Sequence, residues 1–276
     1  KYSGQLLFQS GSYIQVKDYA GAMYPEFSKD KSGQSVINPQ NANTSISFEM
    51  QLFISTGSLH NQIVFQKQNT NLNEGYTFHI RSSSYISDTT NAEFSIYSGS
   101  YRFSVQCPIV KNEFNHIYIA INKELQNYNA IELWNNCELY DSKTINTFGK
   151  LNIDIDDFLI GSGSTFTTET DVITPLDTLY ATLDEFRIFH SLRSVTQLKN
   201  YEKKNIFATD DLKLYYKFNE PQPPIGPGND SINAIVLDSS GNSLHSTIQN
   251  FFSNDNAIYQ SGIISESLLR QNSSLD

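Results

Sequence analysis

Apolar and polar residues alternate with a period of two through most of the first 220 residues, and this pattern limits the possible folds more than any other feature. Successive side chains of a β-strand point to opposite faces, so the alternation predicts strands with one buried face. The runs are short and end at clusters of Gly, Asn, Ser or Asp, such as Ser98-Gly99-Ser100. The clearest runs span residues 46–52, 76–80, 103–107, 117–121 and 212–218.

Many short strands separated by turns predict an antiparallel sandwich or barrel. A parallel α/β sheet is excluded because its strands would be continuous apolar runs. One segment departs from the alternation: Val195, Leu198 and Tyr201 follow helical spacing behind a capping box formed by Ser194 and Gln197. We therefore predict one short amphipathic helix near 194–204 that packs on the strands.

Two polar segments are predicted to be loops. Residues 165–178 are rich in Thr and acidic residues and lie between two candidate strands. Residues 221–229 hold four of the eight prolines, which cannot continue a strand and are typical of a linker. A domain boundary is therefore expected near residue 208.

Charge and hydropathy exclude two classes of partner. The chain carries 29 acidic and 19 basic side chains, and only Lys203 and Lys204 are adjacent basic residues, whereas nucleic acid requires clustered Lys and Arg. No apolar stretch approaches the roughly 20 residues of a membrane helix, and no export signal is visible, so we expect no membrane insertion. The start at Lys1 in place of Met is typical of a processed product or a piece of a longer chain.

Two cysteines are too few for a disulfide framework or a four-Cys zinc site. The distance between Cys107 and Cys137 is not given by the sequence, so a disulfide between them stays open. We favour two unpaired thiols that are buried or half-buried.

Four segments of the first 207 residues carry a resemblance when taken in order. They are residues 6–16, residues 46–52, the strand and hairpin at 114–139, and Ile160-Gly161-Ser162 followed by the run 183–189. In this order they resemble the concanavalin A-like, laminin-G-like (LamG) jelly-roll family. The resemblance covers about residues 4–207 and implies an all-β, two-sheet antiparallel jelly-roll sandwich with one short helix near 194–204.

The sequence departs from the family pattern at two places. The family hairpin usually turns through Asp-Gly, but Asn136-Cys137 stands there. Cys is poor at the positive φ of a type I′ turn, so we expect a different turn, or a turn at Asn135-Asn136 with a shifted register. Gln9 and Ser10 replace the acidic residue that many members place beside the Gly of the opening strand, which weakens an inherited calcium site.

Residues 212–220 and 237–248 resemble the segment that usually precedes the opening strand of such a domain. The resemblance implies a LamG-like jelly-roll domain at 1–207 and a C-terminal segment at 208–276. We favour the start of a second LamG-like module in this segment, because the likeness implies tandem modules. The alternative is a permuted segment that closes the first sandwich.

Acidic residues supply the metal candidates, and calcium is the cation that oxygen ligands favour. Asp156 and Asp157 end the densest acidic cluster, for which a solvated turn is the favoured interpretation. Asp184 alternates with Phe186 on an apolar face, so it must be hydrogen-bonded, paired or metal-bound, and anchoring of a nearby loop or helix is favoured over a ligand role. Glu185 and Arg187 would then form an ordinary same-face pair of little energetic value.

No sequence feature indicates catalysis. Glycosidases of the sandwich superfamily that the chain resembles carry a Glu-x-Asp-x-x-Glu triplet, which is missing, and no HExxH, glycine-rich phosphate loop or nucleophile elbow occurs. A surface rich in Tyr, Asn, Ser and Gln suits recognition of sugar or protein, because rings stack on apolar sugar faces. The candidate ligand-binding rings are Trp134, Tyr85, Tyr97 and Tyr101.

We therefore expect a non-enzymatic carbohydrate- or protein-recognition module of a larger surface assembly. Its partners would be a glycan or surface protein and other subunits of that assembly. Low Lys content and high Ser and Asn content fit a virion surface, as in a phage fibre, tail or capsid-decoration protein, and an extracellular adhesion protein is the near alternative. A purely structural protein–protein interaction domain and a glycan hydrolase are the rival functions.

Overall fold

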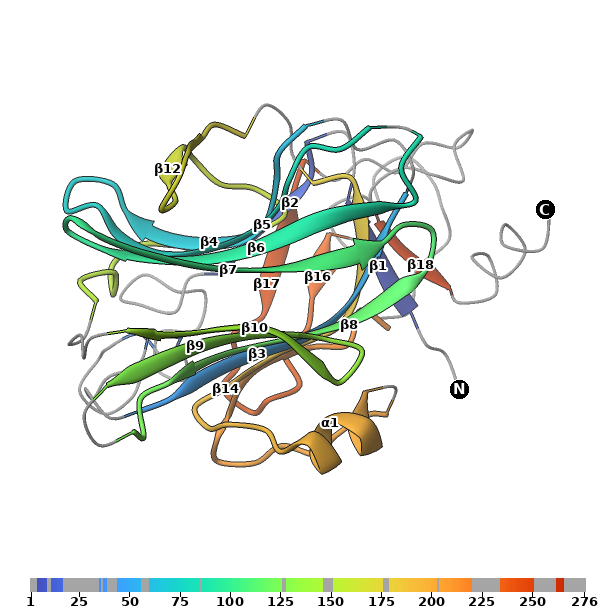
Figure 1. Cartoon of the computed structure of the whole chain (residues 1–276). Helices are drawn as coiled ribbons and strands as arrows, with labels where there is room; N and C mark the ends of the chain where they lie inside the picture. Colours follow the sequence, from blue (N-terminus) through green and yellow to red (C-terminus); the bar gives the residue numbers. More distant parts are fainter. Residues whose placement is uncertain are drawn as a thin grey trace.

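Two large antiparallel sheets lie face to face, and one short helix covers the outside of one of them (Figure 1). The structure is a computed structural model. It describes residues 4–8, 11–16, 35, 37–38, 44–55, 60–84, 86–125, 128–145, 151–175, 179–202, 204–219, 234–250 and 262–265.

The first sheet has the strand order β10-β9-β8-β3-β14-β1-β18, and β15 pairs with the second half of β14. All of its pairings are antiparallel. Its strands are β1 (Gly4–Phe8), β3 (Ile46–Ile54), β8 (Phe114–Asn122), β9 (Asn129–Asn135), β10 (Glu138–Ile145), β14 (Ala181–Phe189), β15 (Leu212–Tyr216) and β18 (Gly262–Ser265).

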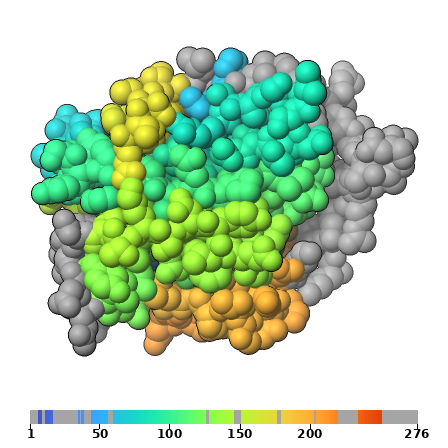
Figure 2. All heavy atoms as spheres, in the orientation of Figure 1, coloured from blue at the N-terminus to red at the C-terminus, as the bar shows by residue number. Residues whose placement is uncertain are grey.

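The second sheet has the order β16-β17-β2-β11-β4-β5-β6-β7 and is also antiparallel throughout. A separate hairpin of β12 and β13 lies over the outside of this sheet, and Figure 2 shows it in yellow above the teal strands. The strands are β2 (Tyr13–Val16), β4 (Gln62–Asn69), β5 (Glu74–Ile80), β6 (Thr89–Ser98), β7 (Tyr101–Val110), β11 (Phe158–Ile160), β12 (Phe166–Thr167), β13 (Val172–Ile173), β16 (Ile235–Val236) and β17 (Ser246–Gln249).

The core between the sheets is built from the apolar half of each alternating run, which confirms the all-β jelly-roll prediction. Phe48 of the first sheet stacks on Phe65 of the second with 4.7 Å between ring centroids, and Phe158 contacts Phe186 at 6.1 Å. All four rings are buried. Such ring pairs stabilise a sandwich beyond the burial of their area.

The outer face of β3 is also buried, although the alternation predicts that this face is exposed to solvent. Ser47, Glu49 and Gln51 are at most 5% exposed because α1 (Val195–Tyr201) and its flanking residues cover them. The Gln51 side chain donates to the Glu202 carbonyl at 2.8 Å. The helix thus converts one polar face into a second layer of packing.

The helix itself confirms the sequence prediction. The Ser194 hydroxyl accepts from the Gln197 N–H and the Gln197 side chain accepts from the Ser194 N–H, which completes the capping box. Leu198 is fully buried against the first sheet, whereas Val195 and Tyr201 are each 40% exposed. Of these three residues at helical spacing, only Leu198 is therefore buried by the contact between the helix and the sheet.

A bulge in β14 overturns the predicted faces of residues 183–188. Asp184 pairs with Gln51 but Arg187 pairs with Glu49, so β14 carries one extra residue, and Glu185 adopts φ +51°. Leu183 therefore shares the core with residues 186 and 188, while Arg187 points outward and is fully buried beneath α1. The predicted pair of Glu185 and Arg187 is present, but it lies beneath the surface, because the two side chains are 13% and 0% exposed. The small energetic value expected for it stays a prediction.

The predicted departure from a positive-φ turn at Asn136-Cys137 is also wrong. Asn136 and Cys137 both adopt positive φ, 50° and 63°, and Glu138 pairs with Asn135 in the unshifted register. Cys137 tolerates this backbone because its side chain packs with Tyr118 and Leu198. Cys107 and Cys137 are free, buried thiols.

The described part of the C-terminal segment pairs with both sheets: β15 with β14, β17 with β2, and β18 with β1. The division at residue 208, and the choice between a second module and a permuted closing segment, stay predictions. Residues 166–173 form the β12–β13 hairpin within the predicted loop, while residues 221–229 lie outside the described residues. No helix of the described chain has the length and apolar character needed to cross a membrane.

Candidate functional site

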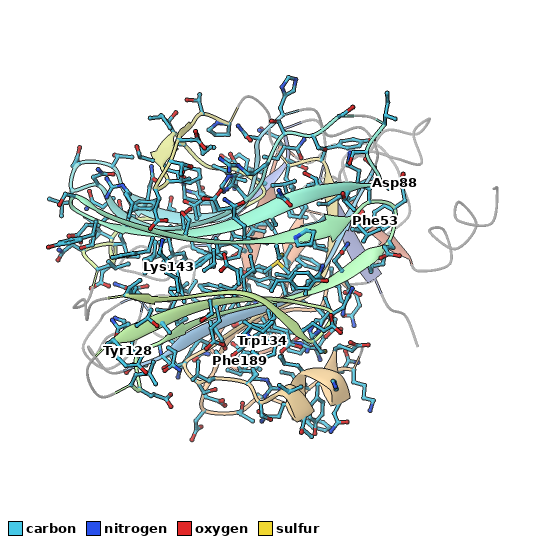
Figure 3. The ribbon with its side chains drawn as sticks, in the orientation of Figure 1. Phe53, Asp88, Tyr128, Trp134, Lys143 and Phe189 are labelled. Carbon is cyan, nitrogen blue, oxygen red and sulfur yellow. The ribbon has the colours of Figure 1, made fainter. Side chains whose placement is uncertain are left out.

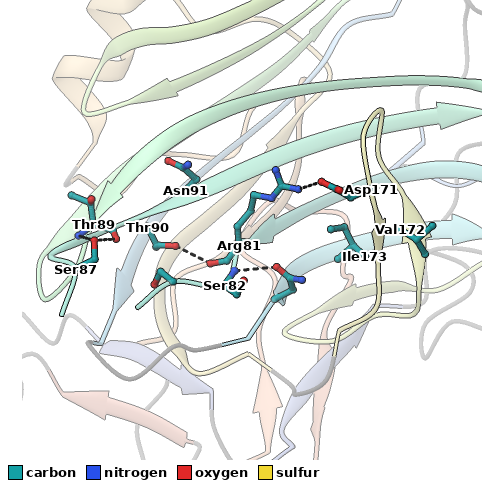
Figure 4. A pocket seen from close by; sticks show the side chains of 11 residues that line it. Arg81, Ser82, Ser87, Thr89, Thr90, Asn91, Asp171, Val172 and Ile173 are labelled. Carbon is teal, nitrogen blue, oxygen red and sulfur yellow. Dashed lines mark hydrogen bonds and ion pairs between the residues drawn. The ribbon is translucent and has the colours of Figure 1, made fainter. Parts of the chain in front are cut away.

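A polar hollow of about 620 Å³ opens between the β12–β13 hairpin and the connection from β5 to β6 (Figure 4). Its walls come from three places: the residue before β4, residues 81–83 and 87–91, and residues 171–173 of the hairpin. The lining residues are Asn61, Arg81, Ser82, Ser83, Ser87, Thr89, Thr90, Asn91, Asp171, Val172 and Ile173.

The hairpin wall is held on the second sheet by a small apolar cluster. Phe166 stacks on Tyr97 with 6.1 Å between centroids and meets His79 edge-on at 5.1 Å. Ile63 and Ile173 complete the cluster. Two strands of two residues each are too short to be stable alone, so this packing positions the hairpin.

An ion pair joins the two walls. Arg81 pairs with Asp171 across the hollow and lies 3.4 Å from Glu93, which is 1% exposed. The Thr170 hydroxyl and the Arg81 guanidinium hold the pKa of Asp171 below its usual value, while burial raises the pKa of Glu93. Arg81 therefore places one positive charge between a rim carboxylate and a buried one.

Hydrogen bonds fix the backbone of the wall that faces the hairpin. The Ser82 N–H donates to Asn61 Oδ1 at 3.0 Å, and the Thr90 hydroxyl donates to the Arg81 carbonyl at 2.8 Å. The Asn91 carbonyl accepts from the Arg81 N–H at 2.8 Å. The residue Asn91 is exposed. The result is a preformed surface of hydroxyl and amide groups, which match the hydrogen-bonding needs of a sugar.

The candidate rings that the structure describes lie on different sheets. Trp134 is half-buried on the outer face of the first sheet, where it meets Tyr118 edge-on at 6.3 Å and donates its indole N–H to Glu132 at 3.0 Å (Figure 3). Tyr101 lies on the second sheet, is 63% exposed and stacks on Phe103.

Tyr97 is not available as a surface platform. Tyr97 is 1% exposed, and its hydroxyl lies 2.5 Å from Gln68 Oε1 and 3.0 Å from the Thr77 hydroxyl. Alternation does not separate an outward strand position from one covered by a hairpin, so the assignment of Tyr97 as a ligand ring is corrected. Tyr85 lies outside the described residues.

The three candidate metal ligands are split between the sheets. Asp184 is in β14 of the first sheet, where its Oδ1 accepts from the Glu185 N–H at 2.8 Å and anchors the bulge. Asp156 and Asp157 precede β11 of the second sheet and line a smaller hollow of about 360 Å³. The three residues therefore cannot share one ion.

Asp156 and Asp157 do not fit a calcium site by themselves. The buried Lys67 ammonium donates to the Asp156 carbonyl oxygen, and the Asp157 carboxylate accepts from Gln15. A lysine ammonium beside a calcium ion repels it, and six to eight oxygens are required. A calcium requirement at these two residues stays a prediction that titration with and without a chelator tests.

Sequence reasoning missed the residues that line the larger hollow. Arg81 and Asp171 are 90 residues apart in sequence and meet only because the β12–β13 hairpin folds over β5 and β6. The one available signal was the acidic, Thr-rich composition of residues 165–178.

Comparisons with known proteins identify the fold. A scan against models of protein families finds no match, and a search of curated protein sequences finds none. Among solved structures, the chain is similar to a candidate carbohydrate-binding protein of Bacteroides ovatus, with 16% identity and a TM-score of 0.57, over 91% of this chain and 59% of that one. The chain thus spans about three fifths of the length of that protein.

Two further solved structures are similar at lower scores. One is an SAP-like pentraxin from Limulus polyphemus, with 9% identity, a TM-score of 0.44, and coverage of 70% of this chain and 82% of that one. The other is the mouse laminin α1 chain, domains LG4-5, with 10% identity, a TM-score of 0.44, and coverage of 67% and 41%. The chain therefore has an all-β, two-sheet antiparallel sandwich fold.

Proposed function

We propose that this chain is a non-enzymatic carbohydrate-recognition module that binds its ligand in the hollow between the β12–β13 hairpin and residues 81–91. The observation that carries the proposal is the convergence of hydroxyl and amide groups with the Arg81–Asp171 pair on a rigid sheet. Such groups form hydrogen bonds with the hydroxyls of a sugar, and a charged planar group adds hydrogen bonds that fix the orientation of the ligand. The assignment of carbohydrate binding to the similar Bacteroides ovatus protein supports this interpretation.

The composition of the hollow also favours binding over hydrolysis. Asp171 is the one carboxylate among the described residues that line it, and it is paired with Arg81. Glycosidases generally need two carboxylates that flank the scissile bond. A sugar bound here would therefore lack an acid/base couple.

A purely structural protein–protein role is the second candidate, because an apolar side chain at the hollow is exposed. Val172, which lines the hollow, is 67% exposed. Exposed apolar residues beside a polar hollow suit a protein contact as well as a sugar face. A measurement of glycan binding distinguishes the two roles, because only the recognition module is expected to bind glycans.

A glycan array probed with and without calcium tests the proposal. The wild type is expected to bind a defined set of glycans, and Asn91→Ala is expected to lower that binding about 2–12-fold through the loss of one hydrogen bond. Asn71→Ala, which removes an exposed amide from the β4–β5 turn outside the hollow, is the matched control and should bind as the wild type. Trp134→Ala tests the rival site on the first sheet.

Each outcome of the array has a distinct meaning. Silence across the array supports the protein-contact role, and sugar product released from a polysaccharide panel supports a hydrolase. Loss of binding in Trp134→Ala together with full binding in Asn91→Ala would move the site to the first sheet.

We further propose that the module belongs to a larger surface assembly with other subunits, on a virion or in an extracellular adhesion protein. The net charge of −10 and the few basic residues support an exterior position. The sequence on either side of residues 1 and 276 tests this, because a further copy of the module would support a tandem assembly.

A further inference from the structure

Three side chains with metal-binding atoms converge beneath the outer layer of the first sheet. His116 comes from β8, Cys137 from the β9–β10 turn, and Glu202 from the C-cap of α1. Cys137 Sγ lies 3.6 Å from His116 Nδ1 and 3.7 Å from Glu202 Oε2, and His116 Nδ1 lies 3.9 Å from Glu202 Oε2. All three donor atoms lie within 4.8 Å of one another.

We propose that His116 Nδ1, the Cys137 thiolate and the Glu202 carboxylate bind one Zn²⁺ ion, with solvent as the fourth ligand. Bonds of about 2.3 Å to sulfur and about 2.0–2.2 Å to nitrogen and oxygen place tetrahedral ligands about 3.3–3.6 Å apart. The Cys137–His116 separation of 3.6 Å lies within this range, the Cys137–Glu202 separation of 3.7 Å lies just above it, and the His116–Glu202 separation of 3.9 Å exceeds it by a few tenths of an ångström. A small movement of the Glu202 carboxylate toward His116 and Cys137 brings these distances into the range.

The imidazole is already oriented for this role. His116 Nε2 lies 3.1 Å from Glu49 Oε1, and Glu49 in turn accepts from Arg187 at 2.7 Å. A carboxylate that accepts from Nε2–H leaves Nδ1 with its lone pair toward the cysteine. Metal-bound histidines almost always have such an outer partner, which fixes the tautomer.

The backbone around the cluster is also held in place. The Glu202 N–H donates to the Leu198 carbonyl at 3.0 Å, and its carbonyl accepts from Gln51. Cys137 occupies a positive-φ turn position that favours Gly or Asn, yet its side chain points inward and is 8% exposed. Residues kept in unfavourable backbone conformations are enriched at functional sites.

The donor set selects the class of metal. One sulfur, one imidazole nitrogen and one carboxylate oxygen suit a borderline ion such as Zn²⁺, whereas calcium and magnesium require oxygen ligands. The His116 side chain is 3% exposed and that of Glu202 is 30% exposed, so the site is enclosed by protein and open to solvent on the Glu202 side. On binding, the Cys137 thiol proton passes to solvent.

Zinc titration of the full chain tests the site. After dialysis against a chelator, the wild type should take up one Zn²⁺ per chain at micromolar zinc, measured by competition with a chromophoric chelator. Co²⁺ should give the visible bands of a tetrahedral site and a thiolate charge-transfer band. Cys137→Ala should abolish that band and lower zinc affinity by more than the roughly 10–100-fold typical of losing an outer-shell partner.

Cys107→Ala is the matched control because Cys107 is the other buried thiol and lies in β7 of the second sheet. It should bind zinc as the wild type does. A second measurement needs no variant: zinc should slow alkylation of Cys137, followed by mass spectrometry, and leave Cys107 unaffected. Absence of one-to-one uptake by the wild type, unchanged affinity in folded Cys137→Ala, or no protection of Cys137 would overturn the proposal.

Discussion

At the scale of single residues, Gly161 shows how one backbone position ties the opening strand to the second sheet. It follows β11 at φ +88°, and a Cβ atom placed there would lie 2.5 Å from the Phe8 ring. Gly161→Ala should lower the free energy of unfolding by about 1–2 kcal/mol for the left-handed backbone and by a further 1–3 kcal/mol, roughly, for overpacking.

Gly99→Ala is the control for this substitution. Gly99 also has a positive φ, +58°, but a Cβ atom placed there would meet nothing within 4 Å. Urea unfolding of both variants separates the two costs, and equal losses would show that the Phe8 contact contributes nothing.

His79 predicts a pH dependence of stability. Burial, followed by the Arg81 guanidinium, lowers the pKa of His79 from 6.5 to about 3. Between these values the unfolded chain binds a proton that the folded chain does not, so stability should fall as the pH falls through this window, by up to about 1.4 kcal/mol per pH unit.

His79→Leu removes this titration while keeping an apolar side chain beside Phe166. The difference in unfolding free energy between wild type and variant should therefore change steadily between pH 6.5 and about pH 4, because contributions from other groups largely cancel. A difference that is constant across this range would show that His79 is solvated in the folded protein.

Arg187 is the residue that secures α1. Fully buried, it donates to Glu49 at 2.7 Å, to the Tyr201 carbonyl at 3.0 Å and to the Lys204 carbonyl at 2.6 Å. Burial alone would lower the pKa of Arg187, but its interactions with Glu49, Tyr215 and Glu185 together outweigh burial and hold the pKa above its usual value.

Arg187→Met should cost about 3–5 kcal/mol in urea unfolding, because it removes the nearest positive charge from the buried Glu49 carboxylate. Lys143→Met breaks an exposed pair with Glu169 and should cost at most about 1 kcal/mol. Similar losses in the two variants would contradict the burial argument.

At the scale of elements, the β12–β13 hairpin links packing to the proposed function. Phe166 is its main apolar contact with the sheet and is 4% exposed. Phe166→Ala should loosen the hairpin, displace Asp171 and weaken glycan binding, with faster hydrogen exchange at the Thr168 N–H, which donates to the Asp171 carbonyl at 2.8 Å.

Phe207→Ala is the comparison for the hairpin variant, because Phe207 is 92% exposed and does not belong to the cluster that holds the hairpin. It should leave both exchange and binding unchanged. Retained glycan binding in Phe166→Ala would show that the hairpin does not shape the site.

The elements also show what sequence alone predicts. Alternation predicts β3, β5, β7 and β8, and the capping box of Ser194 and Gln197 predicts the start of α1, since both signals are local. The bulge at Glu185 reverses the faces beyond it, and no local signal marks the extra residue. Strands of two residues, such as β12, carry no period at all, so the wall of the hollow could not be predicted.

At the scale of the whole molecule, the two faces of the sandwich have different roles. The second sheet carries the hollow under its hairpin, and the first sheet carries the buried Glu49–Arg187 pair and the proposed zinc ligands beneath α1 (Figure 1). Strands that are close in sequence, such as β7 and β8, belong to different sheets. Trp134 and Tyr101 thus lie on separate sheets.

The most direct test of carbohydrate recognition in the hollow is a map of amide chemical shifts by NMR while an array-positive glycan is added. We predict that the largest changes fall on residues 81–91 and 171–173, and that they are lost in Asn91→Ala. Changes centred on Trp134 and the outer face of the first sheet, with none in the hollow, would contradict this assignment.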